Sequence, residues 1–359
     1  MYVIIGLYLI ATAQIVVPNI VTATNIVILA IVFSTLKINV KVASLAIFVI
    51  LLGMTRNLLY QEIDMMSVML AMFILIKSRY QNYLESKFVL SGNHTLLIYA
   101  IQTIAIFIAL TNYFQQGSVA FNTDTSHNHT TTLFLSLYIL SLTFETVKIE
   151  CSERGVKKRF KRHYGDLLNV IAILIMMTLT GRTGLIIAIG ILLYEVRRRN
   201  IYAQILTFIS TIFAYFNYEL VLNYVMMLNG GIVKFATESV ASDVRNDVML
   251  DWIERLMNIQ NWSGFSNGYF VGKFGIGPHN GYIQIQSAMG VIGLFLFLTL
   301  NMVVMLRAIF AKKYELAFLL LLLLTRMYTD TVSNAAVVLL AFLHLYLQAE
   351  IKSLRHKWV

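Results

Sequence analysis

Long apolar runs follow one another along almost the whole of this chain, and one long polar stretch, from about residue 229 to residue 282, interrupts them. About 20 apolar residues are enough for a helix to cross a bilayer. Only 13% of the residues are charged, whereas a soluble domain has about 25%, and the mean hydropathy is +0.73. We therefore predict an all-α polytopic membrane protein, with about 12 transmembrane helices in a single integral membrane domain over residues 1–359.

The basic residues predict how these helices are oriented. Most of the 28 Lys and Arg residues lie in short loops on one side of the predicted helices, and loops rich in Lys and Arg stay in the cytoplasm. Both termini are therefore expected inside, and the stretch 229–282 is expected to be an extracytoplasmic loop. This distribution accounts for the net charge of +10, so we expect no nucleic-acid partner.

One apolar segment, residues 166–195, has basic residues beyond both ends and one charge, Arg182, in its middle. Both ends are then cytoplasmic, which requires two short helices, and Gly181-Arg182-Thr183-Gly184 is the predicted turn between them. A second hairpin is predicted over residues 316–347, with Arg326 and Asp330 in its polar middle. The other predicted spans are at about residues 3–17, 20–36, 42–59, 65–77, 94–112, 132–147, 201–226 and 283–305.

The long loop contains one segment with helical spacing. Apolar residues recur at Val248, Trp252, Leu256 and Ile259, which predicts a short amphipathic helix over residues 244–259 on the outer surface. Trp252, and Tyr282 at the end of the loop, are suited to stacking on sugar rings, although such residues more often form the aromatic belt at a membrane surface. Arg255, on the same helix, is a further candidate for binding substrate.

Several basic residues fall on the outer side, against the orientation rule, and each therefore needs a reason. They are Arg56, Arg182, Lys234, Arg245, Arg255, Lys273 and Arg326. The guanidinium fork suits phosphate oxygens, so Arg182, Arg245 and Arg326 are candidate ligands of a pyrophosphate at the depth of the lipid headgroups. Alternatively, these side chains reach lipid headgroups or pair with outer carboxylates such as Asp247 or Asp330.

His279 lies in a turn between Pro278 and Asn280-Gly281, directly before a predicted span. An imidazole titrates near neutral pH and accepts the proton of a sugar hydroxyl, so His279 is a candidate general base. Asn280 and Tyr282 are the substrate-binding candidates beside it. An ordinary turn histidine at the interface is the alternative.

No metal or other cofactor is predicted. Cys151 is the only cysteine, so a thiolate metal cluster is excluded. The outer loops have no Asp-x-Asp motif of the kind that holds a metal in many sugar transferases, and the chain has no P-loop pattern. If sugar is transferred here, the leaving group is expected to depart without a divalent metal.

Three short motifs together resemble the O-antigen polymerase and ligase superfamily. They are the hairpin sequence Thr178-Leu179-Thr180-Gly181-Arg182-Thr183-Gly184-Leu185, the segment from Arg245 through Trp252 to Leu256, and Gly277-Pro278-His279-Asn280-Gly281-Tyr282 followed by Gly290 and Gly293. The resemblance covers roughly residues 167–297. Gly181 departs from it, since a serine often precedes the arginine in the family's hairpin.

The resemblance implies a membrane glycosyltransferase fold of the GT-C type in the bacterial inner membrane, with a periplasmic active site. It implies a glycan on undecaprenyl pyrophosphate as the donor and a lipid-linked repeat unit as the acceptor. By position, Arg182 and Arg245 take the pyrophosphate-binding roles and His279 the role near the acceptor, while Asp330 matches a less regular acidic position. A chain-length regulator and a flippase are the partner proteins that the resemblance implies.

Two other functions stay open from the sequence. A ligase of the same superfamily would hand the finished glycan to another acceptor, such as a lipid A core. A transporter would move the lipid-linked sugar across the membrane without lengthening it.

Overall fold

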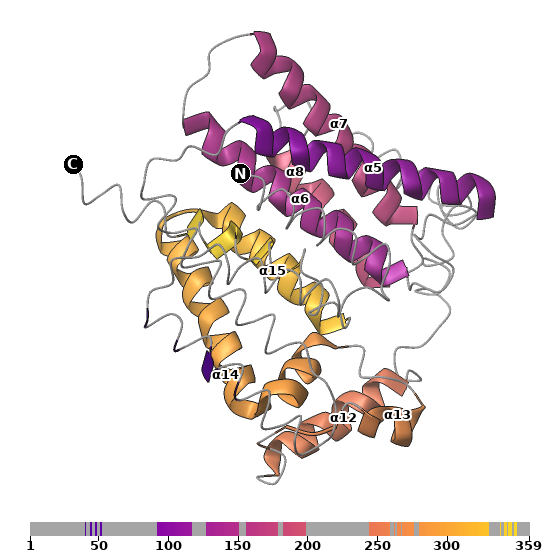
Figure 1. Cartoon of the computed structure of the whole chain (residues 1–359), viewed down its shortest axis with the longest axis vertical. Helices are drawn as coiled ribbons and strands as arrows, with labels where there is room; N and C mark the ends of the chain where they lie inside the picture. The colour runs from indigo at the N-terminus through magenta and orange to yellow at the C-terminus, as the bar shows by residue number, and fades with distance from the viewer. Residues whose placement is uncertain are drawn as a thin grey trace, which may run out of the picture. The chain divides into compact units, whose positions relative to one another are not determined.

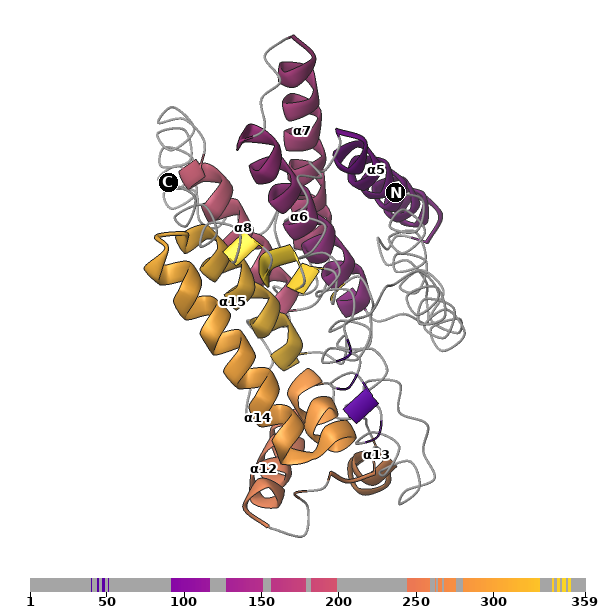
Figure 2. The same ribbon diagram turned by 60° about the vertical axis from the view of Figure 1, so that its left-hand side comes forward.

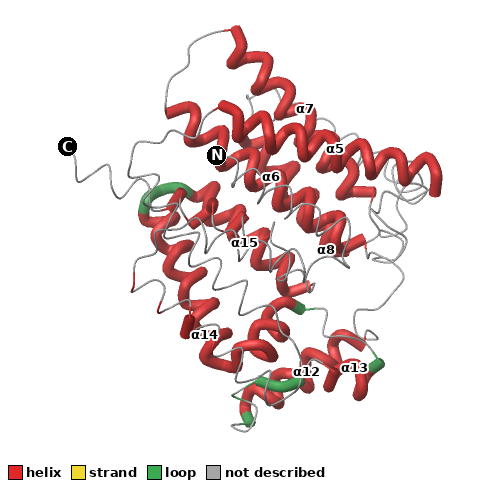
Figure 3. Tube along the Cα trace, in the orientation of Figure 1, coloured by secondary structure: helices red, strands yellow, loops and turns green. Residues whose placement is uncertain are grey.

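The computed structural model describes residues 92–116, 127–150, 156–178, 182–198, 244–258, 264–266, 268–275 and 280–329, with single residues at 40, 44, 47, 48, 51 and 262 and several between 338 and 349. These residues form helices connected by loops, and they contain no strand (Figure 3). The helices are α5 (Gly92–Gln116), α6 (His127–Glu150), α7 (Val156–Thr178), α8 (Arg182–Arg198), α12 (Val244–Met257), α13 (Gly268–Phe274), α14 (Gly281–Phe310) and α15 (Tyr314–Thr329) (Figure 1).

The all-helical prediction is confirmed for the described residues. Two stretches, Leu97–Gln115 in α5 and Met289–Phe310 in α14, are long and apolar enough to cross a membrane, and Thr130–Leu142 and Leu167–Met177 are shorter apolar stretches. The number of 12 spans and the GT-C arrangement stay predictions. Apart from a few single residues, the spans predicted before residue 78 and at 201–226 lie outside the described part of the chain.

The chain divides into two compact units. One comprises residues 1–101, 136–154 and 243–359, and the other comprises residues 102–135 and 155–242. The second unit contains α7 and α8, which pack against each other. Both helices bury apolar side chains, among them Ala172, Met176, Ile187 and Ala188. The predicted division of residues 166–195 into two helices is confirmed, and Arg182 is the first residue of α8.

Polar groups and a close helix contact hold the second unit together. The Gln102 amide donates to the Asn169 side chain over 3.0 Å in its buried interior. Where α8 approaches α6, a Cβ on Gly184 would lie only 2.9 Å from Oγ1 of Thr131. A side chain at this position would therefore force the Thr131 side chain to shift.

In the first unit, α14 is bent at Gly290. The φ and ψ of this residue are 69° and −176°, a conformation that is essentially restricted to glycine. In an unbroken helix the N–H of Val291 would bond to the carbonyl of Ser287. It donates instead to the carbonyl of Trp262 over 2.9 Å. The loop thus supplies an acceptor at the break, so this N–H is not left without a hydrogen bond.

The segment of α14 before the bend folds back beside the segment after it. In a straight helix, residues 282 and 297 would lie about 22 Å apart. The rings of Tyr282 and Phe297 instead pack edge to face, with 6.2 Å between their centroids. The bend lies at the end of α14 nearest α12 (Figures 1 and 2). The sequence prediction of one continuous span over about 283–305 is therefore wrong, because residues 281–289 form a separate short segment.

An aromatic row stabilises this folded-back arrangement. Phe297 contacts Phe342, and Phe342 contacts Tyr346. The Tyr346 hydroxyl donates to the Asn301 side-chain oxygen over 2.7 Å, and the Asn301 amide donates to the Phe297 carbonyl over 2.8 Å. Phe342 and Tyr346 are thereby attached to α14, and α15 packs along α14 as well.

Replacing Gly290 with alanine should lower the melting temperature of the detergent-solubilised protein. A side chain at this φ and ψ is strained by about 1–3 kcal/mol. Gly272→Ala is the matched control, because a Cβ at Gly272 meets nothing within 4 Å, and alanine is favoured over glycine in a helix. A Gly290→Ala protein as stable as the control would contradict the account of the bend.

Candidate functional site

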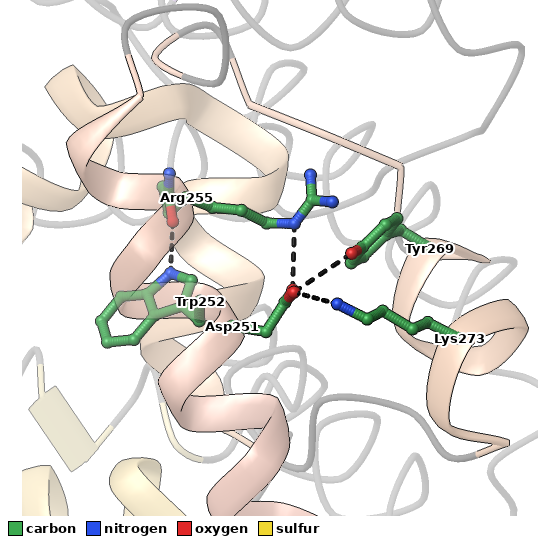
Figure 4. Close-up of polar contacts among 6 residues, drawn as sticks. Asp251, Trp252, Arg255, Tyr269 and Lys273 are labelled. Atoms are coloured by element: carbon green, nitrogen blue, oxygen red, sulfur yellow. Dashed lines mark hydrogen bonds and ion pairs between the residues drawn. The ribbon is translucent and has the colours of Figure 1, made fainter.

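Asp251 on α12 is the centre of a polar cluster with α13 (Figure 4). Its carboxylate accepts a hydrogen bond from Nε of Arg255 over 3.0 Å, one helical turn away. It also accepts from Nζ of Lys273 over 2.5 Å and from the Tyr269 hydroxyl over 3.2 Å. Only 10% of the Asp251 side chain is exposed. One carboxylate thus joins two helices that are separated in the chain.

The Arg255 guanidinium lies over an aromatic ring. Its central carbon is 3.4 Å from the centroid of Tyr269 and 5.9 Å from that of Phe265. The Lys273 ammonium lies 5.1 Å from the Phe274 ring. Such contacts stabilise a cation over the face of a ring. With one carboxylate against two cations, the cluster carries a net positive charge.

The ion pairs shift the pKa values of the cluster. Desolvation raises the pKa of Asp251, but the hydrogen bonds from Lys273 and Arg255 outweigh it and hold the pKa below the ordinary value of 3.8. The bond to Asp251, with a smaller contribution from Tyr269, raises the pKa of Lys273 above its ordinary value of 10.5. Both groups are therefore charged across the neutral range.

An apolar core beneath the cluster fixes α12 and α13 against the start of α14. Val248, Phe265, Phe270 and Ile283 are buried together, and Trp252 packs against them. The side chain of Ser266 accepts a hydrogen bond from the Gly268 N–H over 3.1 Å, which caps the first turn of α13.

Hydrogen bonds also join α12 and its following loop to the folded-back segment of α14. The Trp252 indole N–H donates to Oε1 of Gln286, and the Gln286 side chain is fully buried. The Ser287 hydroxyl donates to the Phe265 carbonyl over 3.0 Å. A Cβ on Gly264 would lie 2.5 Å from the Ser287 carbonyl oxygen, so the loop backbone lies directly against this segment.

The amino end of α14 contacts α15. Asn280 caps the helix, since its side-chain oxygen accepts from the N–H groups of Tyr282 and Ile283 over 2.8 and 3.2 Å. The Tyr282 hydroxyl donates to the Leu324 carbonyl over 2.9 Å. A Cβ on Gly281 would lie 3.1 Å from the Met327 carbonyl oxygen. Gly281 and Tyr282, the last two residues of that motif, therefore lie beside the turn of α15 that carries Arg326.

Five predicted site residues are placed by their side chains in the first unit. Trp252 and Arg255 lie on α12, Asn280 and Tyr282 lie at the start of α14, and Arg326 is fully buried on α15. Both α12 and α15 contact the folded-back segment of α14. Trp252 binds Gln286 and packs on the loop core, while Arg255 binds Asp251 and lies over the Tyr269 ring, so both residues hold the loop together.

The three predicted catalytic residues are placed less fully. Arg182 begins α8 in the second unit, and Arg245 lies in the first turn of α12. The structure describes the backbone of these two residues. His279 and Asp330 lie outside the described residues. The proximity of Arg182, Arg245 and His279 therefore stays a prediction.

Three residues of this region were not selected as site residues from the sequence. Asp251 and Arg255 are four residues apart on a predicted helix, and this spacing alone indicates an ion pair between them. Tyr269 and Gln286 had no such signal, since each meets a partner far away in the chain.

Replacing Asp251 with asparagine should destabilise the protein by about 1–3 kcal/mol at neutral pH, because hydrogen bonds to a charged group are lost. A depressed carboxyl pKa stabilises the fold above the unfolded value and ceases to do so as pH falls through the folded value. The difference between wild type and Asp251→Asn should therefore be constant near pH 7 and shrink below about pH 3.8, the ordinary value.

Thermal unfolding at a series of pH values measures this difference. Glu254→Gln is the control, because Glu254 is an exposed carboxylate on the same helix. An Asp251→Asn protein that loses no more stability than the control at pH 7 would contradict the role given to this cluster.

Comparison with known proteins adds no assignment. No family model, no curated protein and no solved structure matches this chain. The resemblance to the O-antigen polymerase and ligase superfamily therefore rests on the three short motifs alone.

Proposed function

We propose that this chain is a polysaccharide polymerase of the O-antigen type in the bacterial inner membrane. It would transfer a growing glycan from undecaprenyl pyrophosphate to a sugar hydroxyl of a lipid-linked repeat unit. The reaction takes place at the periplasmic face, without a metal and with inversion at the anomeric carbon. The proposal includes the GT-C architecture and the 12 spans predicted from the sequence.

One structural observation supports the proposal: the folded-back segment of α14 joins two of the three resembling motifs. Its Gln286 binds Trp252 of the Arg245-to-Leu256 motif. Its amino end continues from Pro278-His279 and contacts α15 at Met327, next to Arg326. Residues far apart in the sequence are thereby attached to one short helical segment, as a site assembled from separate motifs requires.

The charge in this region suits an anionic substrate. The amino end of a helix carries a partial positive charge, and the amino end of α14 adjoins the turn of Arg326. Half-helices that end inside a membrane protein commonly point this end at an anionic group of the substrate. A lipid pyrophosphate is the anionic group that the proposed reaction provides.

The chemistry of the proposal is a single displacement. The acceptor hydroxyl oxygen bonds to the anomeric carbon of the donor glycan, the bond from that carbon to the phosphate oxygen breaks, and the lipid pyrophosphate leaves. Arg182 and Arg245 neutralise the negative charge that develops on the leaving group. His279 accepts the proton of the acceptor hydroxyl.

Purified protein should lengthen a defined undecaprenyl-pyrophosphate-linked repeat unit in detergent, and a chelator should leave the rate unchanged. His279→Ala should slow extension about 10²- to 10⁴-fold, the usual contribution of a general base. Arg182→Ala and Arg245→Ala should each slow extension strongly, because a fixed positive charge at the leaving group is lost. Product length on gels and by mass spectrometry measures these rates.

Arg307→Gln is the control, since Arg307 is an exposed arginine at the other end of α14. Normal extension by the His279→Ala protein at equal expression contradicts the role of that residue. Transfer of a finished glycan to a different acceptor, with no lengthening, identifies a ligase. Passage of the lipid-linked sugar across vesicles without either reaction identifies a transporter.

A further inference from the structure

Helix α12 has an exposed apolar row opposite the face that packs into the loop. Leu250, Ile253 and Met257 are 62%, 46% and 86% exposed. At about 100° per residue, the three positions lie within about 60° of the helix circumference. The buried face, with Val248 and Trp252, points the other way. The row is thus a separate surface that the contacts of the loop core leave uncovered.

Two hydrogen bonds determine which part of α14 lies beside α12 and the loop that follows it. One joins Trp252 of α12 to Gln286, and the other joins the Trp262 carbonyl to the Val291 N–H. Val291 lies in the first turn of the apolar stretch Met289–Phe310. Helix α12 and its following loop therefore lie beside the end at which this stretch begins.

Exposed apolar residues also lie in the loop after α12 and on α14 just past Val291. Trp262 is 51% exposed, and its indole N–H donates to the Leu256 carbonyl over 3.2 Å. Just past Val291 on α14, Ile292, Phe295 and Leu296 are exposed. Apolar side chains on a membrane-crossing helix face lipid, and tryptophan is enriched where the lipid meets water. Helix α12 and Trp262 are thus at the level where a surface suited to lipid begins.

The positions of the charged residues of α12 agree with a helix that lies in the plane of a membrane surface. The exposed carboxylates of Asp247 and Glu254 lie on one flank of the row, about 40–60° from Leu250. Arg255 lies on the far side, in the cluster with Asp251. Exposed charges beside an apolar row are typical of a helix that lies in the plane of a membrane surface.

We propose that Leu250, Ile253, Met257 and Trp262 insert into the outer leaflet of the bilayer. Helix α12 is then an interfacial helix that holds the Asp251 cluster at the depth of the lipid headgroups. This inference rests on the membrane setting of the proposed function and is independent of whether the chain transfers sugar. The phospholipid bilayer itself is the partner of this surface.

Nitroxide labels at single cysteines test the proposal on the full chain in vesicles of phosphatidylethanolamine and phosphatidylglycerol. In a Cys151→Ser background, Leu250→Cys, Ile253→Cys and Met257→Cys should each give a label that collides severalfold more with oxygen than with a water-soluble nickel chelate. Glu254→Cys, one turn from Leu250 on the flank, is the matched control and should give the opposite preference.

Labels of the row that meet the nickel chelate as readily as the Glu254 label would show the row in water and overturn the proposal. Row labels shielded from both reagents would show a protein partner or a second copy on this face and would equally overturn it. Glycan extension, measured on the same proteins, reports on the proposed function separately.

Tryptophan fluorescence gives a second measurement without a label. Lipids brominated near the acyl carbonyls should quench part of the emission of the wild-type protein, and Trp262→Phe should remove that part. The substitution keeps an apolar ring at an exposed position, so the fold should persist. Equal quenching of both proteins would place Trp262 outside the bilayer and overturn the proposal.

Discussion

The backbone break at Gly290 determines how the described part of the first unit is arranged. A helix that turns back needs a residue that tolerates φ of 69°, and it needs a partner for each hydrogen bond that the turn breaks. Glycine tolerates this φ. The Trp262 carbonyl accepts a hydrogen bond from the Val291 N–H, which the bend has separated from its helical partner. Because that carbonyl belongs to the long loop, the bend and the loop depend on each other.

This dependence accounts for the position of the polar cluster. Before the loop reaches Trp262, α12 is held on Gln286 by Trp252 and packs into the apolar core around Phe270. Asp251 then ties α12 to α13 at the outer side of that core. A half-buried carboxylate between two cations costs desolvation, which the two ion pairs and the Tyr269 hydroxyl offset. The charges of Arg255 and Lys273 therefore serve the loop's own structure.

The sequence predicted those features that depend on neighbouring residues. The α7–α8 hairpin followed from basic residues beyond both ends of an apolar run, and α12 followed from the spacing of Val248 and Trp252. The bend in α14 could not be predicted, because a glycine in an apolar run has no charge or period that marks a break. The contact of Gln286 with Trp252 likewise joins residues far apart in the chain, and hydropathy marks Gln286 only as a polar residue within a span.

Arg255 holds the loop together, and this bears on which arginines act on the leaving group in the proposed mechanism. Its Nε is held by Asp251 and its face is covered by Tyr269, so a change at Arg255 alters the loop before it alters any charge on a leaving group. Loss of activity in an Arg255 variant is thus ambiguous, because a displaced loop also moves the amino end of α14. Arg245, in the first turn of α12, is placed by that same loop core. The distinction between a residue that binds pyrophosphate and one that positions the loop requires activity and melting temperature to be measured on each variant together.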